Sequence, residues 1–384
     1  MKFMHLSDLH LGKSLGDFDL IDDQKYILDR LIEICREKKV DAVLIAGDVY
    51  DKSIPSEAAT GLLDRFLKEL VENGIAVYLI SGNHDSDDRL NFGSSLFMSS
   101  QVYINSVFSG TMAKNIMEDE YGTLNVYSLP FVKASQVRHY YPDQEIKNYE
   151  DAVRTVIEQA GINEKERNLM IAHQFVAGNS DPEMSGSEGL GTQTVGLVEK
   201  IGWNVFDGFD YAALGHIHAP QKIGRNEVRY AGSPLKYSLS EVNSRKSVPI
   251  IDMKEKGNVQ IELVPLIPLR DIRHITGTLR ELLDPKNVKS PEDFIYATLT
   301  DEDEEPNLKG IFSQTYPNTV KIDYDNSRTR ECGQVDLDRI EKTKSFPELI
   351  RDFYEQMYGC EISEEEMKIM ESAAREAGVL HEAD

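Results

Sequence analysis

Short apolar runs alternate with amphipathic stretches along the first 265 residues, and this alternation constrains the fold more than any other feature of the sequence. Residues 22–38 and 56–73 carry apolar side chains at helical spacing. The intervening apolar runs have the length of strands that are covered on both faces. Candidate strands are Lys2–Leu6, Asp41–Ala46, Ala76–Ile80, Leu169–Ala172, Tyr211–Leu214, Arg229–Ala231, Val248–Met253 and Val259–Val264. The pattern predicts a layered α/β domain.

The chain changes character after Pro265 and Pro268. Residues 269–335 predict a smaller α/β unit, with a helix near Leu279–Leu283 and strands at Phe294–Leu299 and Thr319–Ile322. Residues 336–384 then predict two amphipathic helices, 337–357 and 363–377. We therefore expect three parts: 1–268, 269–335 and 336–384.

Composition narrows the class of protein. No run approaches the roughly 18 unbroken apolar residues that a membrane helix needs, so we expect no membrane span. The N-terminal residues are polar where a secretory signal would be apolar. The three cysteines, Cys35, Cys332 and Cys360, match no zinc or redox spacing, which favours a reducing cytoplasm.

The charge of the chain disfavours a polyanionic partner without excluding it. The formal net charge is −24. Residues 336–384 hold 14 acids and 6 bases, so −8 of that charge lies in the predicted tail. Divalent cations bound among carboxylates would also reverse the local field.

Metal-competent side chains follow five of the candidate strands. Because ligands bind beyond the carboxyl ends of strands in α/β folds, we expect these strand ends to meet. The D-x-H and H-x-H spacings would place two side chains on one side of extended backbone, and Gly47, Gly82 and Gly215 would permit sharp turns. The residues are Asp8, His10, Asp48, Asn83, His84, Asp85, His173, His216 and His218.

Each of these short motifs alone is explained as well by a turn or a surface pair. Five of the nine histidines fall at these strand ends, however, and turns do not account for that coincidence. The set therefore predicts a metal site. The other histidines have plainer interpretations: His5 is expected in or near the core, and His139, His274 and His381 outside the site. The pair Tyr140 and Tyr141 could stack on bases but is more typical of local packing.

The strings DLH, GDVYD, GNHD, AHQ and GHIH, taken in this order, resemble those of the calcineurin-like binuclear metallophosphoesterases. The fuller strings SDLHLG, AGDVYD, SGNHDS and LGHIHAPQ, with PLRDIRHITGTLREL beyond them, resemble the SbcD-like family of bacterial DNA repair nucleases. The resemblance covers about the first 330 residues. It implies a layered α/β/β/α domain followed by a small α/β capping domain and a C-terminal helical tail.

The resemblance also implies two divalent metal ions, most often Mn²⁺. One ion would be held by Asp8, His10, Asp48 and His218, and the other by Asp48, Asn83, His173 and His216, with Asp48 shared. Oxygen and imidazole donors without thiolate suit Mn²⁺, Fe or Zn²⁺. His84 would assist at the scissile phosphate. Asp85 would either orient His84 or cap the following turn, and the sequence leaves both open.

The function expected from the resemblance is a metal-dependent DNA nuclease, an exonuclease on duplex ends and an endonuclease on single strands or hairpins. It would work in DNA repair and recombination with an SbcC-like ATPase that docks on the C-terminal helices. The apolar stripe of these helices would equally serve an ordinary helix pair packed within the monomer. A homodimer is also expected, through the apolar stretches Leu62–Val71 and Leu90–Met98, although packing inside the monomer would explain these stretches as well. The alternatives are a phosphodiesterase for a small substrate such as a cyclic nucleotide, and a scaffold that has lost the chemistry. The second domain disfavours the first alternative, and the complete set of metal-competent residues disfavours the second.

Overall fold

The computed structural model describes residues 1–178, 180–186, 200–303, 305–327 and 329, and near the C-terminus 350–351, 354, 362–363 and 366–370. One compact unit comprises Met1–Thr300 with Glu304–Asp323, and a second comprises Asp301–Asp303 with Tyr324–Asp384. The predicted tail helices lie mostly outside the described residues. Within the second unit, residues 366–370 are helical.

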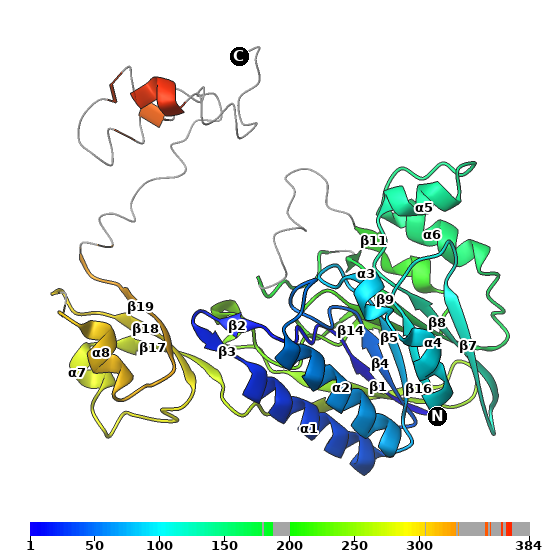
Figure 1. The fold of residues 1–384 in the computed structure, drawn as a ribbon, viewed down its shortest axis with the longest axis horizontal. Coiled ribbons are helices and arrows are strands. Elements are labelled where there is room, and N and C mark those ends of the chain that lie inside the picture. Colours follow the sequence, from blue (N-terminus) through cyan, green and yellow to red (C-terminus); the bar gives the residue numbers. More distant parts are fainter. Residues whose placement is uncertain are drawn as a thin grey trace. The chain divides into compact units, whose positions relative to one another are not determined.

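Two six-stranded sheets form the centre of the first unit (Figure 1). In the first sheet the order is β16-β15-β1-β4-β5-β6. Strands β1, β4, β5 and β6 are parallel, β15 pairs antiparallel with β1, and β16 pairs antiparallel with β15. The bounds are β1 Lys2–Leu6, β4 Ala42–Ala46, β5 Ala76–Ile80, β6 Val102–Asn105, β15 Ser247–Met253 and β16 Val259–Pro265.

The second sheet has the order β13-β14-β12-β9-β8-β7. Its four inner strands, β14, β12, β9 and β8, are parallel, and the edge strands β13 and β7 are antiparallel to their neighbours. The bounds are β7 Ala113–Asp119, β8 Gly122–Leu129, β9 Arg167–His173, β12 Tyr211–Gly215, β13 Gln221–Ile223 and β14 Arg225–Tyr230.

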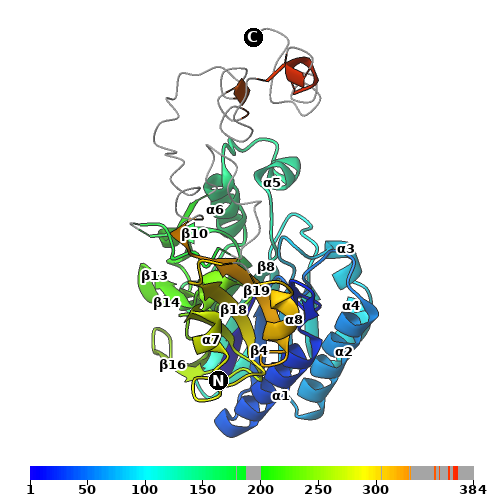
Figure 2. The same cartoon turned by 90° about the vertical axis from the view of Figure 1, so that its left-hand side faces the viewer.

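Helices cover the outer faces of both sheets, so the predicted α/β/β/α layering is confirmed. Helices α1 (Ile21–Lys38) and α2 (Glu57–Glu72) lie side by side against the first sheet, as Figure 1 and Figure 2 show. Helices α5 (Ala134–Tyr140) and α6 (Tyr149–Gln159) pack on the second sheet. A third cluster, which includes Phe3 and Tyr211, fills the space between the sheets.

Local chemistry explains where these helices begin and end. The Ser56 side chain accepts a hydrogen bond from the Ala59 amide at 3.2 Å and caps the first turn of α2, as the sequence predicted. Helix α1 ends at Lys39 in the left-handed conformation. Shorter elements are β2 Ser14–Leu15, β3 Phe18–Asp19, α3 Asp87–Leu90, α4 Ser94–Phe97, β10 Val176–Ala177 and β11 Ile201–Gly202.

A three-stranded sheet follows Pro268, and its strand order is β17-β18-β19. It comprises β17 Ile272–Gly277, α7 Leu279–Leu282, β18 Phe294–Leu299, α8 Leu308–Ser313 and β19 Thr319–Tyr324. An ion pair between Arg270 and Asp23 joins it to α1, and the rings of Phe18 and Phe294 meet edge to face at 6.0 Å. Both contacts lie inside the first compact unit.

Among the described residues, no helix is both long and apolar enough to cross a membrane. Cys35 is buried as a free thiol in the core beneath α1. It therefore serves packing, as its lack of a partner in the sequence pattern indicated.

His5 is fully buried between the two sheets, as the sequence predicted, and its Nδ1 lies 3.0 Å from the Tyr211 hydroxyl. Burial, assisted by the charge of Arg229, lowers the pKa of His5 to about 3. The folded protein therefore holds this imidazole neutral, whereas the unfolded chain protonates it near pH 6.5. Stability from this site is present above pH 6.5 and is lost as the pH falls from 6.5 toward 3.

We expect His5→Gln, which keeps a hydrogen-bonding group beside Tyr211, to reduce this acid sensitivity. Between pH 7 and pH 5 the free energy of unfolding should fall by about 2 kcal/mol less in the variant than in the unmodified protein. Urea denaturation of metal-free protein at the two pH values measures the difference. An equal fall in both proteins would contradict the assignment of a neutral buried His5.

Candidate metal centre

The predicted residues meet where the carboxyl ends of strands from both sheets face each other. Asp8 and His10 follow β1, Asp48 follows β4, and the segment 82–85 follows β5, all in the first sheet. His173 ends β9, and His216 and His218 follow β12, in the second sheet. The predicted convergence is confirmed, and the strand ends that meet belong to two facing sheets.

The loops after β1 and β4 continue the pairing of their strands. Backbone hydrogen bonds run from Asp8 to Gly47 and from His10 to Asp48, both at 3.0 Å. The expectation of extended backbone is wrong here: Asp8, His10 and Asp48 have φ values of 52°, 43° and 49°, and His216 has 105°. These are conformations that L residues rarely adopt, and they persist because the paired loops fix them. They aim the side chains inward.

Gly82 and Gly215 are required because neighbouring atoms come too close to leave room for a side chain, and not because of the sharp turn that the sequence predicted. A Cβ on Gly215 would lie 1.9 Å from the Ala46 carbonyl oxygen, and one on Gly82 would lie 2.1 Å from Asp48 Oδ1. Any side chain there would push the two sheets, or the β5 loop and Asp48, apart. These glycines set the spacing of the site.

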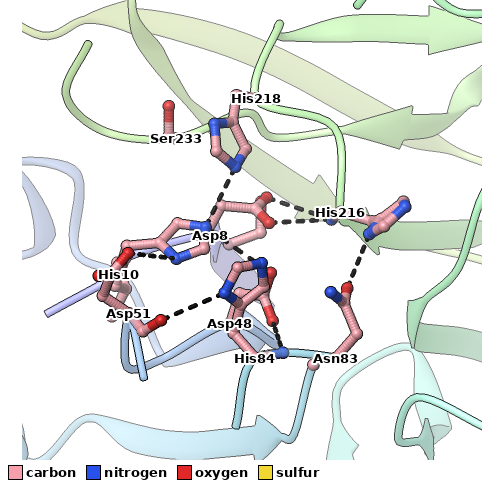
Figure 3. Close-up of polar contacts among 12 residues, drawn as sticks. Asp8, His10, Asp48, Asp51, Asn83, His84, His216, His218 and Ser233 are labelled. Carbon is pink, nitrogen blue, oxygen red and sulfur yellow. Dashed lines mark hydrogen bonds and ion pairs between the residues drawn. The ribbon is translucent and has the colours of Figure 1, made fainter. Parts of the chain in front are cut away.

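Asp8, His10 and His218 form one compact group of donors, with ligand atoms all within 4.8 Å of one another (Figure 3). The Nε2 atoms of His10 and His218 lie 3.1 Å apart. The Asp8 carboxylate accepts hydrogen bonds from the His216 amide at 3.0 and 3.2 Å. All three side chains are buried, so bulk solvent does not separate their ligand atoms.

Asp48 lies between this group and a second one. Its Oδ2 is 3.6 Å from His10 Nε2 and 3.4 Å from His173 Nε2. On the far side, Asn83 Oδ1 lies 3.1 Å from His173 Nε2 and 2.9 Å from His216 Nδ1. One carboxylate thus adjoins two clusters of oxygen and imidazole donors.

The electrostatics of this site favour a bound cation. Burial raises the pKa of Asp8, and the nearby Asp48 charge raises it further. Burial would also raise the pKa of Asp48, but the histidines around it, led by His173, hold it well below its usual range, and the pKa of His173 rises in return. The site therefore retains protons to balance its carboxylates. A divalent cation would replace those protons.

The donor set fits divalent metal ions. His10 Nδ1 is buried without a hydrogen bond among the described residues, and His10 Nε2 faces a second imidazole nitrogen. Imidazole nitrogens that face each other beside two carboxylates interact poorly with one another, whereas all of these atoms can bind one cation. When bound, divalent ions would supply charge stabilisation at a phosphate and a nucleophilic water.

His84 lies at the edge of the site and is half-buried. Its ring meets that of His10 edge to face at 4.9 Å, and its Nδ1 is 3.2 Å from the Asp51 carbonyl oxygen. Nδ1–H donating to that carbonyl leaves Nε2 free for a substrate oxygen. The residue that orients His84 is therefore Asp51.

Asp85 does not orient His84. Its carboxylate accepts hydrogen bonds from the amides of Gly82 and Val49 through Oδ2, and from Tyr50 through Oδ1, at 2.9 to 3.0 Å. It ties the loop after β5 to the loop after β4. These three hydrogen bonds fit neither of the two roles that the sequence left open, because the amides belong to the preceding segment and to the β4 loop and not to the turn that follows Asp85.

Sequence reasoning passed over Asp51. It follows Asp48 by three residues in the string GDVYD, and that spacing was the available signal. Its carboxylate lies 3.7 Å from His10 Nδ1 and 2.7 Å from Lys13 Nζ, and with His10 and His84 it forms a further possible metal-ligating group.

His139 and His274 are exposed and lie outside the site, as predicted; His381 is outside the described residues.

A family model described as calcineurin-like phosphoesterase matches residues 1–220, which is more than half of the chain. A second model, described as Type 5 capsule protein repressor C-terminal domain, matches residues 268–358. A solved dimetal phosphatase from Danio rerio aligns with a TM-score of 0.38 and 12% identity, over 70% of this chain and 99% of that chain.

The SbcD component of the nuclease SbcCD from Staphylococcus epidermidis is 33% identical over 374 residues, which is 95% of each chain. The chain belongs to the calcineurin-like phosphoesterases and, among them, to the SbcD family.

Proposed function

We propose that this protein is a metal-dependent DNA nuclease of DNA repair and recombination, an exonuclease on duplex ends and an endonuclease on single strands or hairpins. The observation that carries the proposal is the position of the Asp48 carboxylate between two donor clusters, 3.6 Å from His10 and 3.4 Å from His173. A shared carboxylate suits two cations spaced for in-line displacement at phosphorus. The relative at 33% identity is part of a nuclease by name.

Two metal subsites share this carboxylate in our proposal. The first comprises Asp8, His10, Asp48 and His218; the second comprises Asp48, Asn83, His173 and His216. The 3.1 Å approach of His10 to His218 supports the first set, and the contacts of Asn83 with both His173 and His216 support the second. The donors, which include no thiolate, suit Mn²⁺, Fe or Zn²⁺, and Mn²⁺ is the proposed native ion because the family resemblance implies it.

His84 is the proposed catalytic residue. In its doubly protonated form the ring would donate Nε2–H to the scissile phosphate and either stabilise the developing charge or protonate the leaving oxygen. Asn83 beside it is exposed, whereas Asp8, His10 and His218 are buried. Substrate would therefore reach the site from the side of the loop after β5.

Metal-depleted protein should be inactive, and Mn²⁺ should restore cleavage of end-labelled duplex, hairpin and single-stranded DNA. A parallel incubation with a cyclic nucleotide tests the rival hypothesis of a small substrate. Hydrolysis of the cyclic nucleotide with intact DNA in the same reaction would overturn the proposal. A protein that takes up no metal would overturn it as well.

The proposed partner is an SbcC-like ATPase, bound through residues 336–384, with the small sheet of 269–335 as a capping domain that helps to select DNA. The tail carries 14 acids and 6 bases around its apolar positions, a pattern suited to packing beside a coiled coil. The proposed location is the cytoplasm, which fits the free Cys35 thiol.

Deletion of residues 336–384 should abolish capture of the ATPase and any ATP-stimulated digestion. Metal uptake and basal Mn²⁺-dependent cleavage should persist, because every proposed ligand lies before residue 219. A pull-down and a melting curve on the same truncated protein provide the measurement. If the truncated protein melts early and still captures the partner, the tail serves the fold and not docking.

A homodimer is also proposed, on a smaller surface than the sequence indicated. The apolar residues Leu62, Leu63, Phe66 and Leu70 of α2 are buried in the core of the first unit, so they cannot form an interface. The stretch 90–98 does present apolar surface: Phe92, Leu96, Phe97 and Met98 are exposed, Phe92 by 85%. Several exposed large apolar side chains within one short segment are typical of a protein contact.

The double substitution Phe92→Asp and Leu96→Asp should convert the dimer to a monomer, because two charges would be buried in the contact. Ile116→Asp, at a residue on β7 that is 61% exposed, is the matched control and should leave the dimer intact. Sedimentation at micromolar concentration measures the mass. An unmodified protein that sediments only as a monomer would remove the proposal.

A further inference from the structure

A buried ion pair lies directly behind the loop that carries His218. Lys246 Nζ is 2.5 Å from Glu241 Oε2, 2.8 Å from Ser233 Oγ and 2.9 Å from the His218 carbonyl oxygen. An ammonium group has three N–H donors, and each of these contacts uses one. The side chains of Lys246 and Glu241 are 4% and 0% exposed, so water does not compete for the bonds. The His218 carbonyl is thereby fixed to a buried cation.

The same pair reaches His10 through Tyr237. Glu241 Oε1 accepts a hydrogen bond from the Tyr237 amide at 3.0 Å, which leaves Oε2 for Lys246. The Tyr237 ring meets the rings of His10 and His218 edge to face, at 5.6 and 5.8 Å. Its hydroxyl donates to the Leu9 carbonyl, next to His10. Tyr237 therefore limits the rotation of both imidazoles and holds the loop that carries His10.

The other half of the site rests on different supports. His173 Nδ1 lies 2.8 Å from the Ala46 carbonyl, and its ring meets Phe131 at 6.3 Å. The His216 ring meets Phe175 at 6.2 Å. These contacts come from β4, from the loop after β8 and from the segment after β9, whereas Lys246, Glu241 and Tyr237 come from the chain after β14. The two halves of the site can therefore be perturbed separately.

We propose that Lys246, Glu241 and Tyr237 are positioning residues for the His10–His218 half of the metal centre and set the affinity of that half alone. Partners behind a metal ligand fix its orientation, and their loss typically weakens metal binding by about 10- to 100-fold. The inference rests on the two subsites proposed above. A role in fold stability alone would leave both metal affinities unchanged in the folded protein.

Lys246→Met removes the charge and keeps the length of the side chain. We expect metal-free Lys246→Met protein to bind one Mn²⁺ about 10- to 100-fold more weakly than the unmodified protein and the other equally well. Arg167→Met is the matched control, because Arg167 is also buried and paired, with Asp119, but at the opposite end of β9 from His173. It should lower the melting temperature and leave both affinities unchanged. Calorimetric titration well below each melting temperature gives both values.

Double variants identify the affected half. In a His218→Ala background Lys246→Met should cause no further loss of Mn²⁺ affinity, whereas in an Asn83→Ala background it should weaken the remaining ion. Equal weakening of both ions, or of neither, would overturn the inference. If Lys246→Met fails to fold, Tyr237→Leu makes the same test and should weaken the same ion. An unmodified protein that binds fewer than two ions would instead contradict the proposed metal centre, so the two failures can be distinguished.

Discussion

Asp48→Ala is expected to abolish phosphodiester hydrolysis and to lower bound metal to well under two ions. Asp48 Oδ2 lies between His10 and His173, and Oδ1 accepts the His84 amide at 2.9 Å. The variant would remove the shared donor of both clusters and also the anchor of the catalytic loop. Among the described residues, Asp8 is the other carboxylate close to both His10 and His173, but its two hydrogen bonds from the His216 amide hold it in place, so we expect it not to replace Asp48. Metal analysis and cleavage of end-labelled duplex measure the two effects.

Asp210→Ala is the matched control for this prediction. Asp210 is also a buried carboxylate that accepts backbone amides, from Asn168 at 2.7 Å and Gly257 at 3.0 Å, but it lies just before β12, at the end remote from the site. Its loss should lower stability and leave two ions bound. An Asp48→Ala protein that retained two ions and full activity would show that the shared carboxylate is wrongly assigned.

The sequence predicted the strands that carry the site because they are buried on both faces. Strands β1 and β5 have the bounds that their apolar runs indicated, and β4 begins and β12 ends one residue later. Strand β9 is longer, Arg167–His173 where Leu169–Ala172 was predicted. A fully buried strand must be apolar at nearly every position, so its limits can be read from composition. The metal-competent residues follow such strands directly, which is why their convergence was also predictable.

The edge strand β7 of the second sheet was not predicted, for a physical reason. Strand β7, AKNIMED, alternates half-buried and exposed residues, and its position is fixed by pairing with β8 and not by burial.

The exposed and buried parts of the expected dimer surface could not be told apart from the sequence either. Helix α2 and the segment 90–98 are both rich in large apolar residues, and only tertiary packing decides which of them is covered.

The choice of hydrogen-bond partner was the least predictable feature of the site. Asp85 follows His84 in the chain but binds amides of the neighbouring loop, and the carbonyl that faces His84 comes from Asp51, 33 residues earlier. Left-handed backbone at Asp8 and His10 similarly depends on pairing with the β4 loop. Such contacts join segments that are distant in sequence, so spacing alone carries no signal for them.

His84→Ala should separate catalysis from metal binding. Its ring faces Asp51 and His10 from the edge of the site, and the proposed ligand sets do not need it. Metal content should therefore stay near that of the unmodified protein while turnover falls by about 10²- to 10⁴-fold, the scale of a positioned acid–base group. Metal analysis and steady-state cleavage of a duplex substrate, with kcat and KM determined separately, provide the measurement.

The alternative role of His84 makes a different prediction. Because His10, Asp51 and His84 could together hold an ion, a ligand role would make metal content and turnover fall in parallel. His139→Ala, at an exposed histidine outside the site, is the control and should change neither quantity. A loss confined to kcat with two ions retained would support proton transfer or charge stabilisation at the phosphate, since a residue that merely bound DNA would raise KM instead.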